Sequence, residues 1–306
     1  MEENTEQRVD LTLFSEKIQE LKDRIASVIV GQEQTVDLVL TAILANGHVL
    51  IEGVPGVAKT LLARLTARLI DADFSRVQFT PDLMPSDVLG TTVFNMKTNA
   101  FDFHQGPIFA DIVLVDEINR APAKTQAALF EVMEERQISI DGTTHRMGDL
   151  YTILATQNPV EQEGTYKLPE AQLDRFLMKI TMDYPSLEEE VNILERHHTN
   201  AALVKLDDIV PAITKEELLS LRAFMNQVFV DRTLLQYIAL IVQQTRTSKA
   251  VYLGASPRAS VAMLQSSKAY ALLQGRDFVT PEDIKFVAPY VLQHRLILTA
   301  EAEMEG

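Results

Sequence analysis

The clearest signal of the fold is His48-Val-Leu-Ile-Glu-Gly-Val-Pro-Gly-Val-Ala-Lys-Thr60. Its first part, His48 to Glu52, is a short apolar run typical of a buried strand. A glycine-containing loop follows, and from Thr60 to Ile70 leucines recur at helical spacing. A strand, a glycine loop and a helix in this order are the context of a phosphate-binding loop, which disfavours the alternative of an ordinary glycine-rich turn.

The loop predicts a site for a nucleoside triphosphate with magnesium. Its residues are Gly53, Val54, Pro55, Gly56, Val57, Ala58, Lys59 and Thr60. A phosphate chain needs backbone N–H groups, a helix N-terminus and a cation, and Lys59 supplies the cation. Thr60 supplies a hydroxyl for magnesium. The usual loop pattern has a second glycine where this chain has Ala58, so we expect Ala58 to have a negative φ, as at a helix start.

A pair of acids follows a second apolar run. Ile112 to Val115 is continuously apolar, which indicates a strand buried on both faces, and Asp116 and Glu117 come directly after it. Asp116 is predicted to hold magnesium through its water shell, and Glu117 to orient or deprotonate the attacking water. Two acids alone would be a solvated strand end. The phosphate-binding loop earlier in the chain favours the catalytic interpretation.

Asn158 follows a third apolar run, Ile153 to Ala155. Ligands of open α/β sheets bind at the carboxyl ends of strands, so Asn158 is expected to reach the γ-phosphate or its water. The alternative is an asparagine that forms a turn before Pro159.

Two arginines are candidates on weaker grounds, since each is also consistent with a surface ion pair. Arg175 lies in the segment Leu168 to Phe176. Arg258 follows Ser256-Pro257, which has the form of a helix start. A cation in the first turn opposes the helix dipole, and this placement favours an anion as its partner.

The rest of the chain divides into two parts. The expected elements before residue 185 are helices at 15–27, 34–45 and 124–136, strands at 76–80, 151–155 and 176–182, and hairpins at 91–104 and 137–147. From Tyr184-Pro185-Ser186 onward everything is predicted to be helical, with capping boxes such as Ser186 with Glu189. We therefore expect an α/β domain at residues 1–185 and a helical domain at 186–306.

Composition restricts the class of protein. The chain has 306 residues, of which 46% are hydrophobic, and no cysteine, which favours a reducing compartment. The N-terminus, Met1 to Gln7, is acidic and is no signal peptide, and no apolar run is long enough for a membrane span, so we expect a cytoplasmic protein. The net charge of −15 disfavours nucleic acid as the main partner. The histidines are interpreted as structural, and the acids Glu131, Glu134 and Glu135 as a solvated helix face.

Taken together, the motifs resemble the MoxR family of AAA+ ATPases over essentially the whole chain. They are Gly53 to Thr60, Gln78 to Asp87, Val115 to Pro122, Ala155 to Pro159, Glu170 to Phe176 and Ser256 to Ala259. Alanine is usual in this family at the position of Ala58. The resemblance implies the α/β class, with a P-loop AAA+ αβα nucleotide-binding domain followed by a smaller, all-helical lid domain.

The resemblance also implies a role for each candidate. Lys59 and Thr60 match Walker A, Asp116 and Glu117 match Walker B, Asn158 matches sensor 1, Arg175 matches the arginine finger that completes a neighbouring subunit's site, and Arg258 matches sensor 2 of the lid. The segment with Val30 and Gln32 looks like the one near the nucleotide base. The hairpins at 91–104 and 137–147 look like the helix-2 insert and the pre-sensor-1 hairpin. Whether Arg258 acts on its own subunit or a neighbour stays open.

The function implied by the resemblance is ATP-driven, chaperone-like remodelling or maturation of client proteins. It comes with ATP and Mg²⁺ as cofactors, a hexameric ring of identical chains, and adaptor partners that often carry a von Willebrand A domain. Two alternatives remain. A nucleotide-dependent switch with little turnover is disfavoured by the intact pair Asp116 and Glu117 and by Arg175. A nucleic-acid motor is disfavoured by the acidity of the chain.

Overall fold

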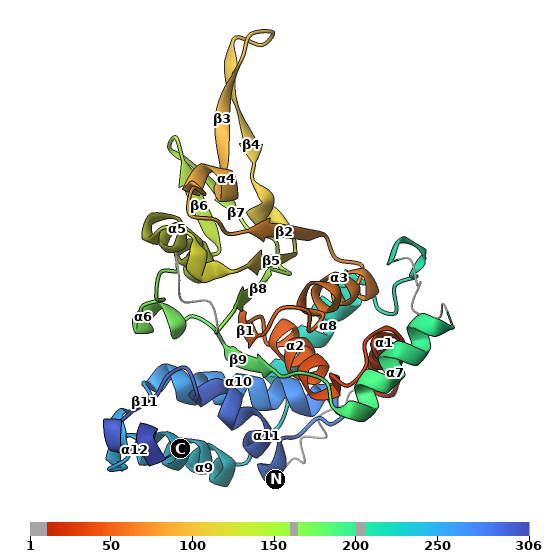
Figure 1. Ribbon diagram of the computed structural model, residues 1–306, viewed down its shortest axis with the longest axis vertical. Coiled ribbons are helices and arrows are strands. Elements are labelled where there is room, and N and C mark those ends of the chain that lie inside the picture. The colour runs from red at the N-terminus through yellow and green to blue at the C-terminus, as the bar shows by residue number, and fades with distance from the viewer. Residues whose placement is uncertain (1–10, 160–164, 200–205, 306) are drawn as a thin grey trace, which may run out of the picture.

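The computed structural model describes residues 11–159, 165–199 and 206–305, so the acidic segment Met1 to Gln7 lies outside the described residues. Within the described residues, five parallel strands form a central sheet in the order β2-β5-β8-β1-β9 (Figure 1). The strands are β1 (Val49–Gly53), β2 (Phe74–Gln78), β5 (Ile112–Asp116), β8 (Thr152–Gln157) and β9 (Met178–Met182). Each expected strand is therefore present, with its ends moved by one to a few residues.

Helices cover both faces of this sheet. They are α1 (Thr12–Val28), α2 (Glu33–Leu44), α3 (Lys59–Leu69), α4 (Pro85–Leu89), α5 (Ala123–Glu135) and α6 (Glu170–Leu173). Successive strand residues point to opposite faces. In β5, Ile112 and Leu114 join a core cluster with α1, α2 and α3, whereas Val113 and Val115 join a second cluster with α5. All of β5 is buried, as its continuous apolar run predicts.

Both predicted hairpins are confirmed. In the longer one, β3 (Gly90–Asn95) pairs with β4 (Ala100–Gln105) and projects away from the body of the molecule (Figure 1). In the shorter one, β6 (Gln137–Ile140) pairs with β7 (Thr143–Arg146). Asp141 and Gly142 join its strands with φ angles of 49° and 78°. Two left-handed residues in a row form the tight hairpin turn that an Asp-Gly pair favours.

The chain after Pro185 is mainly helical. Its helices are α7 (Leu187–His198), α8 (Lys215–Phe224), α9 (Arg232–Thr247), α10 (Pro257–Leu273), α11 (Pro281–Leu292) and α12 (Ala300–Glu305). The predicted capping box at Ser186 forms, with its hydroxyl accepting from the backbone of Glu189. The expectation of helices alone is wrong in one detail, because β10 (Val251–Leu253) and β11 (Ile297–Leu298) form a small antiparallel sheet. Strands this short are too brief to show an alternating pattern in the sequence.

The two parts share one core. α10 packs against α2. The buried cluster that contains Ile112 and Leu114 of β5 also includes Val39 of α2 and Met263 of α10. A division at residue 185 therefore stays a prediction. No helix in the described ranges is both long enough and apolar enough to cross a membrane.

Candidate active site

The phosphate-binding loop lies at the carboxyl end of β1 and leads directly into α3. Gly53 packs so closely on β9 that a Cβ atom there would lie 2.8 Å from the carbonyl oxygen of Met182. The ammonium of Lys59 donates to the Gly53 carbonyl. Burial lowers the pKa of Lys59, while the charges of Asp116 and Glu117 raise it. Lys59 therefore lies close enough to Asp116 and Glu117 to interact with their charges, as expected for residues predicted to share one site.

Ala58 lies in the left-handed region, with φ 60° and ψ 22°, so the predicted negative φ is wrong. Gly56 also has a positive φ, 90°. Left-handed residues beside right-handed ones turn successive backbone N–H groups toward a common point, and such a concavity binds anions. Ala58 adopts this conformation directly before Lys59, the first residue of α3. A residue with a Cβ atom loses roughly 1–2 kcal/mol in the left-handed region.

Ala58→Gly is expected to raise the free energy of unfolding by about 1 kcal/mol, because glycine adopts this φ without a steric cost. Ala239 supplies a matched control, since it is exposed inside α9. There the same change is expected to lower the free energy of unfolding by about 1 kcal/mol. Urea denaturation of both variants checks the difference. A loss of stability at both positions would contradict a left-handed Ala58.

Asp116, at the end of β5, is held by side chains from both neighbouring strands. The hydroxyl of Thr156 in β8 donates to Asp116 Oδ1 at 3.0 Å and accepts from the backbone N–H of Glu117 at 3.0 Å. Arg76 of β2 places its Nε 2.6 Å from Asp116 Oδ2. Because the Asp116 side chain is only 9% exposed, these contacts fix the direction in which its carboxylate faces.

Glu117 is oriented by a separate set of donors. It has a left-handed φ of 55°, and its Oε2 accepts from Gln78 Nε2 at 2.8 Å and from Arg120 Nη1 at 2.9 Å. Sequence reasoning missed these donors, and Arg76 and Thr156 as well. The available signal was the polar pair Arg76 and Gln78, two residues apart in an expected strand. It becomes informative only once β2 is known to lie beside β5.

Asn158 comes directly after β8, which lies between β5 and β1 in the sheet. Its side chain is almost completely buried. The ends of β5, β8 and β1 share one edge, so Asn158 lies between the acids and the phosphate-binding loop. The structure thus brings together Asp116, Glu117, Asn158 and the loop with Lys59 and Thr60, at the edge where such sheets bind ligands.

A cavity of about 260 Å³ adjoins the loop. The predicted residues Val30 and Gln32 line it, together with Gly56, Val57 and Ala58 of the loop. The sequence did not predict the other lining residues. They are Pro185, Ile193, Arg196 and His197, from α7 and the segment before it, and Val28, Ile29 and Leu61. Arg196 also donates to the backbone carbonyl of Ser27 at 2.8 Å and so ties α7 to α1.

Arg175 and Arg258 lie together, but at the opposite edge of the sheet from the loop. Both line a cavity of about 530 Å³ with Gly47 and His48, which precede β1. Both contact Glu134 at the end of α5: Arg175 Nε lies 2.7 Å from Oε2, and Arg258 Nη2 donates to Oε1 at 2.9 Å. An anion was predicted as the partner of Arg258. Within this chain, that partner is the carboxylate of Glu134. Glu134 is exposed, as expected of a solvated helix face, and in addition it is paired with both arginines.

The length of β1 separates these arginines from their own loop. β1 has five residues, which span about 17 Å at about 3.3 Å per residue. The loop follows its last residue, whereas the arginine cavity surrounds the residues before its first. An arginine side chain is much shorter than this strand.

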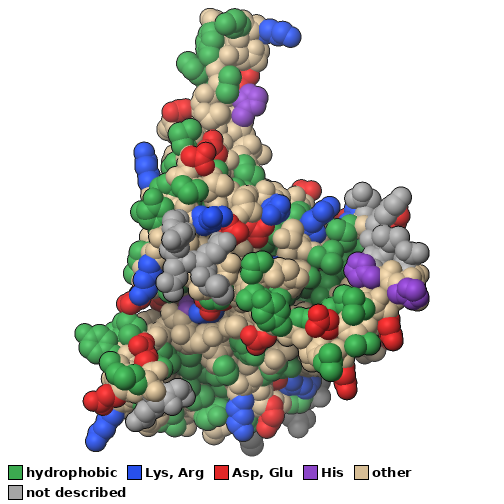
Figure 2. Space-filling model, in the orientation of Figure 1, with side chains coloured by type: hydrophobic (Ala, Val, Ile, Leu, Met, Phe, Trp, Pro, Cys, Tyr) green, Lys and Arg blue, Asp and Glu red, His purple; other side chains and the backbone are tan. Residues whose placement is uncertain are grey.

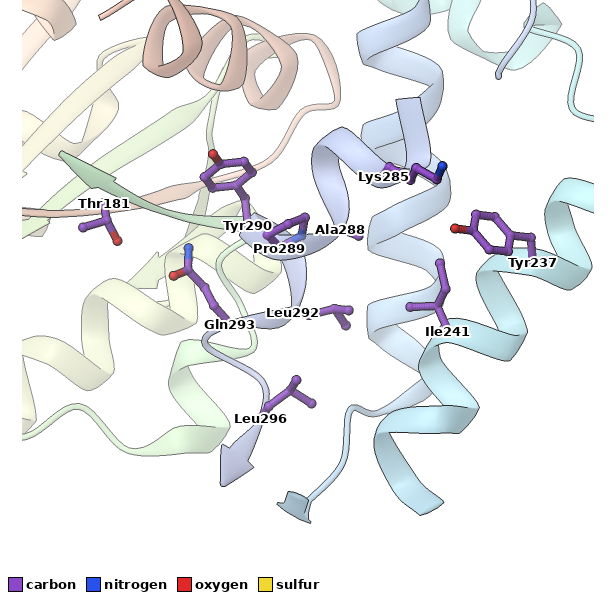
Figure 3. A pocket seen from close by; sticks show the side chains of 10 residues that line it. All are labelled: Thr181, Tyr237, Ile241, Lys285, Ala288, Pro289, Tyr290, Leu292, Gln293 and Leu296. Atoms are coloured by element: carbon purple, nitrogen blue, oxygen red, sulfur yellow. The ribbon is translucent and has the colours of Figure 1, made fainter. Parts of the chain in front are cut away.

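A further cavity, of about 560 Å³, lies between β9, α9 and α11 and contains none of the predicted site residues (Figure 3). Its walls are mostly apolar and aromatic: Tyr237, Ile241, Ala288, Pro289, Tyr290, Leu292 and Leu296, with Thr181, Lys285 and Gln293. It shares no lining residue with the loop cavity or with the arginine cavity.

Comparison with known proteins agrees with this geometry. Residues 48–178 match the ATPase family associated with various cellular activities (AAA), and residues 243–306 match the AAA lid domain. The chain is 45% identical to Chaperone MoxR1 of Mycobacterium tuberculosis, over 91% of this chain and 75% of that protein. It is 30% identical to Protein MoxR of Methylorubrum extorquens, over 96% and 91%.

A solved structure supports the same assignment. A protein from Cytophaga hutchinsonii, 42% identical in sequence, superposes with a TM-score of 0.88 over 97% of this chain and 92% of that one. The α/β fold with a helical lid is thereby confirmed. On the strength of these similarities, the chain belongs to the MoxR family of AAA+ ATPases.

Proposed function

We propose that this ATPase hydrolyses ATP to ADP and phosphate with Mg²⁺, at a site shared between neighbouring copies in a hexameric ring, and uses the cycle to remodel partner proteins. The observation that carries the proposal is the separation of the two halves of the site. The phosphate-binding loop follows β1, and the arginines Arg175 and Arg258 lie around the residues before β1.

Within one copy, the residues at the loop edge bind the nucleotide. Lys59 and the backbone N–H groups from Gly53 to Thr60 contact the phosphates. The Thr60 hydroxyl and the Asp116 carboxylate are hard oxygen donors of the kind that fits Mg²⁺. When bound, the ion would neutralise phosphate charge during transfer. Glu117, oriented by Gln78 and Arg120, accepts a proton from water, and Asn158 donates to the γ-phosphate or to that water.

A second copy supplies the cations for the charge that develops on the transferred phosphoryl group. Arg175 and Arg258 do not reach the loop of their own chain, so both act on the loop of a neighbour. Contacts of this kind join different surfaces of identical chains, and they close into a ring when the rotation between copies permits it. The six-fold count follows the resemblance to the family.

Protein is the client class that the surface favours. The net charge of −15 opposes a nucleic-acid backbone. The β3–β4 hairpin carries exposed apolar side chains far from the body: Val93, Phe94, Met96 and Phe101 (Figure 2). Phe94 and Phe101 pack edge to face with ring centroids 5.2 Å apart. A projecting apolar surface is typical of a protein contact. An adaptor with a von Willebrand A domain is the partner that the resemblance suggests.

Mixing two inactive variants tests the shared site. Lys59→Ala removes the phosphate cation but leaves Arg175, whereas Arg175→Ala leaves the loop intact. Each alone is expected to turn over little ATP. Co-expressed in equal amounts and purified through two different tags, they are expected to recover up to about one quarter of wild-type turnover. Half of the loops are then intact, and half of those face an intact arginine.

The control for this mixture replaces Lys59→Ala with the double variant Lys59→Ala/Arg175→Ala, which supplies no arginine and is expected to restore nothing. If the tags co-purify and the first mixture is as inactive as the control, each chain hydrolyses ATP alone and the shared site is wrong.

A further inference from the structure

Glu134 is the contact that the two distant arginines have in common. It lies in the last turn of α5, and its side chain is 35% exposed. Each of its carboxylate oxygens takes one arginine, Oε2 facing Arg175 and Oε1 facing Arg258. Arg175 precedes β9 and Arg258 lies in the first turn of α10, so Glu134 joins side chains from the α/β part and the helical part of the chain.

Both guanidinium groups keep donors for another anion. A guanidinium has five N–H groups. Arg258 gives one to Glu134, and its side chain is 60% exposed. Arg175 donates from Nη1 to the Ala171 carbonyl at 3.0 Å. Its Nε, although 2.7 Å from Glu134, is not aligned for a hydrogen bond and has no other acceptor among the described residues. Glu134 therefore holds the arginines by charge without using up their hydrogen-bonding capacity.

The backbone around Arg175 is tied to the helical part by a second set of contacts. Arg295, with a side chain only 4% exposed, places its Nε 2.6 Å from Asp174 Oδ1. The hydroxyl of Ser256, two residues before Arg258, lies 3.4 Å from Asp174 Oδ2. The backbone segments that carry Arg175 and Arg258 are thus held together through Asp174. Glu134 acts only on the position of the two guanidinium groups.

We propose that Glu134 is a positioning residue, which pairs Arg175 and Arg258 so that both guanidinium groups meet the neighbour's phosphates as one unit. Without a carboxylate between them the two cations repel each other. The inference rests on the proposed function, because the arginines need positioning only if they act on a neighbouring copy. The opposite relation, in which Glu134 withholds the arginines from the phosphates, predicts the opposite sign for its removal.

Glu134→Gln is expected to lower kcat about 10- to 100-fold, the scale of a misplacement of about 1 Å in a catalytic group. The affinity for ATP, measured by titration with a fluorescent analogue, is expected to stay unchanged, because the loop lies at the other end of β1. Glu131→Gln is the matched control. It makes the same change on the same helix at an exposed residue and is expected to leave kcat unchanged.

Two further variants separate positioning from a general loss of structure. Glu134→Asp keeps the charge and is expected to retain more turnover than Glu134→Gln at a similar melting temperature. In an Arg258→Ala background no second cation has to be held, so Glu134→Gln is expected to cost much less of the remaining turnover. An equal fractional loss in both backgrounds, or turnover in Glu134→Gln at or above wild type, would overturn the proposal.

The outcome for Arg175→Ala shows which idea fails. If that variant turns over ATP like wild type, the arginines have no role and the proposed function falls together with the role of Glu134. If it is impaired while Glu134→Gln is not, only the role of Glu134 is wrong.

Discussion

Arg175→Ala is expected to lower ATP turnover about 10³- to 10⁵-fold, the range for removing an arginine supplied by a neighbouring chain. The affinity for ATP is expected to change little, because Arg175 lies in the cavity around the residues before β1 and away from the loop. Steady-state phosphate release and equilibrium nucleotide binding, measured on the same preparation, check the two halves of this statement.

The control is Arg232→Ala, which removes an exposed arginine at the start of α9 and is expected to leave turnover unchanged. A shared site also makes specific activity rise steeply with protein concentration wherever the ring dissociates on dilution. If Arg175→Ala bound ATP poorly but hydrolysed each bound molecule at the normal rate, Arg175 would be a binding residue and the assignment would fail.

Glu117→Gln is expected to lower turnover about 10²- to 10⁴-fold, because an amide cannot accept the proton of the attacking water. ATP should stay bound, since Lys59, Thr60 and Asp116 are untouched. The amide can still accept from Gln78 and Arg120, so the site should keep its shape. Recovering radiolabelled ATP, rather than ADP, from the purified variant is the measurement.

This variant also gives access to the client. In a pull-down read by mass spectrometry, proteins retained by Glu117→Gln with ATP but not by Lys59→Ala are those held in the ATP state. Lys59→Ala is the matched control because it lacks the phosphate cation. Rapid hydrolysis by Glu117→Gln would show that Glu117 is not needed in the mechanism. The variant would then not stay in the ATP-bound state that the pull-down requires.

Much of the fold was predictable because its signals are local. The apolar run of β5 and the Asp-Gly turn between β6 and β7 each specify a structure within a few residues. The pair β10 and β11 was missed, because strands of two or three residues carry no periodicity.

The conformation of Ala58 shows where local reasoning failed. Propensity favours a negative φ for alanine, and the prediction followed it although the usual loop pattern has a glycine at this position. In the loop, Ala58 has a φ of 60° directly before the first residue of α3, and a left-handed residue beside right-handed ones is typical of backbone that binds anions. The conformation of the whole loop, and not the intrinsic preference of alanine, sets the φ angle of Ala58.

For the proposed nucleotide site, the sequence was enough to name Lys59, Thr60, Asp116, Glu117 and Asn158 as candidates, because each belongs to a motif with a recognisable local order. The surroundings of these residues are visible only in the folded chain. Strand order places Arg76 and Gln78 beside the acids, and the length of β1 sets Arg175 and Arg258 apart from their own loop. A motif contains only residues that are close along the chain, whereas the pairing of Glu134 with two arginines distant in the chain exists only after the core has packed.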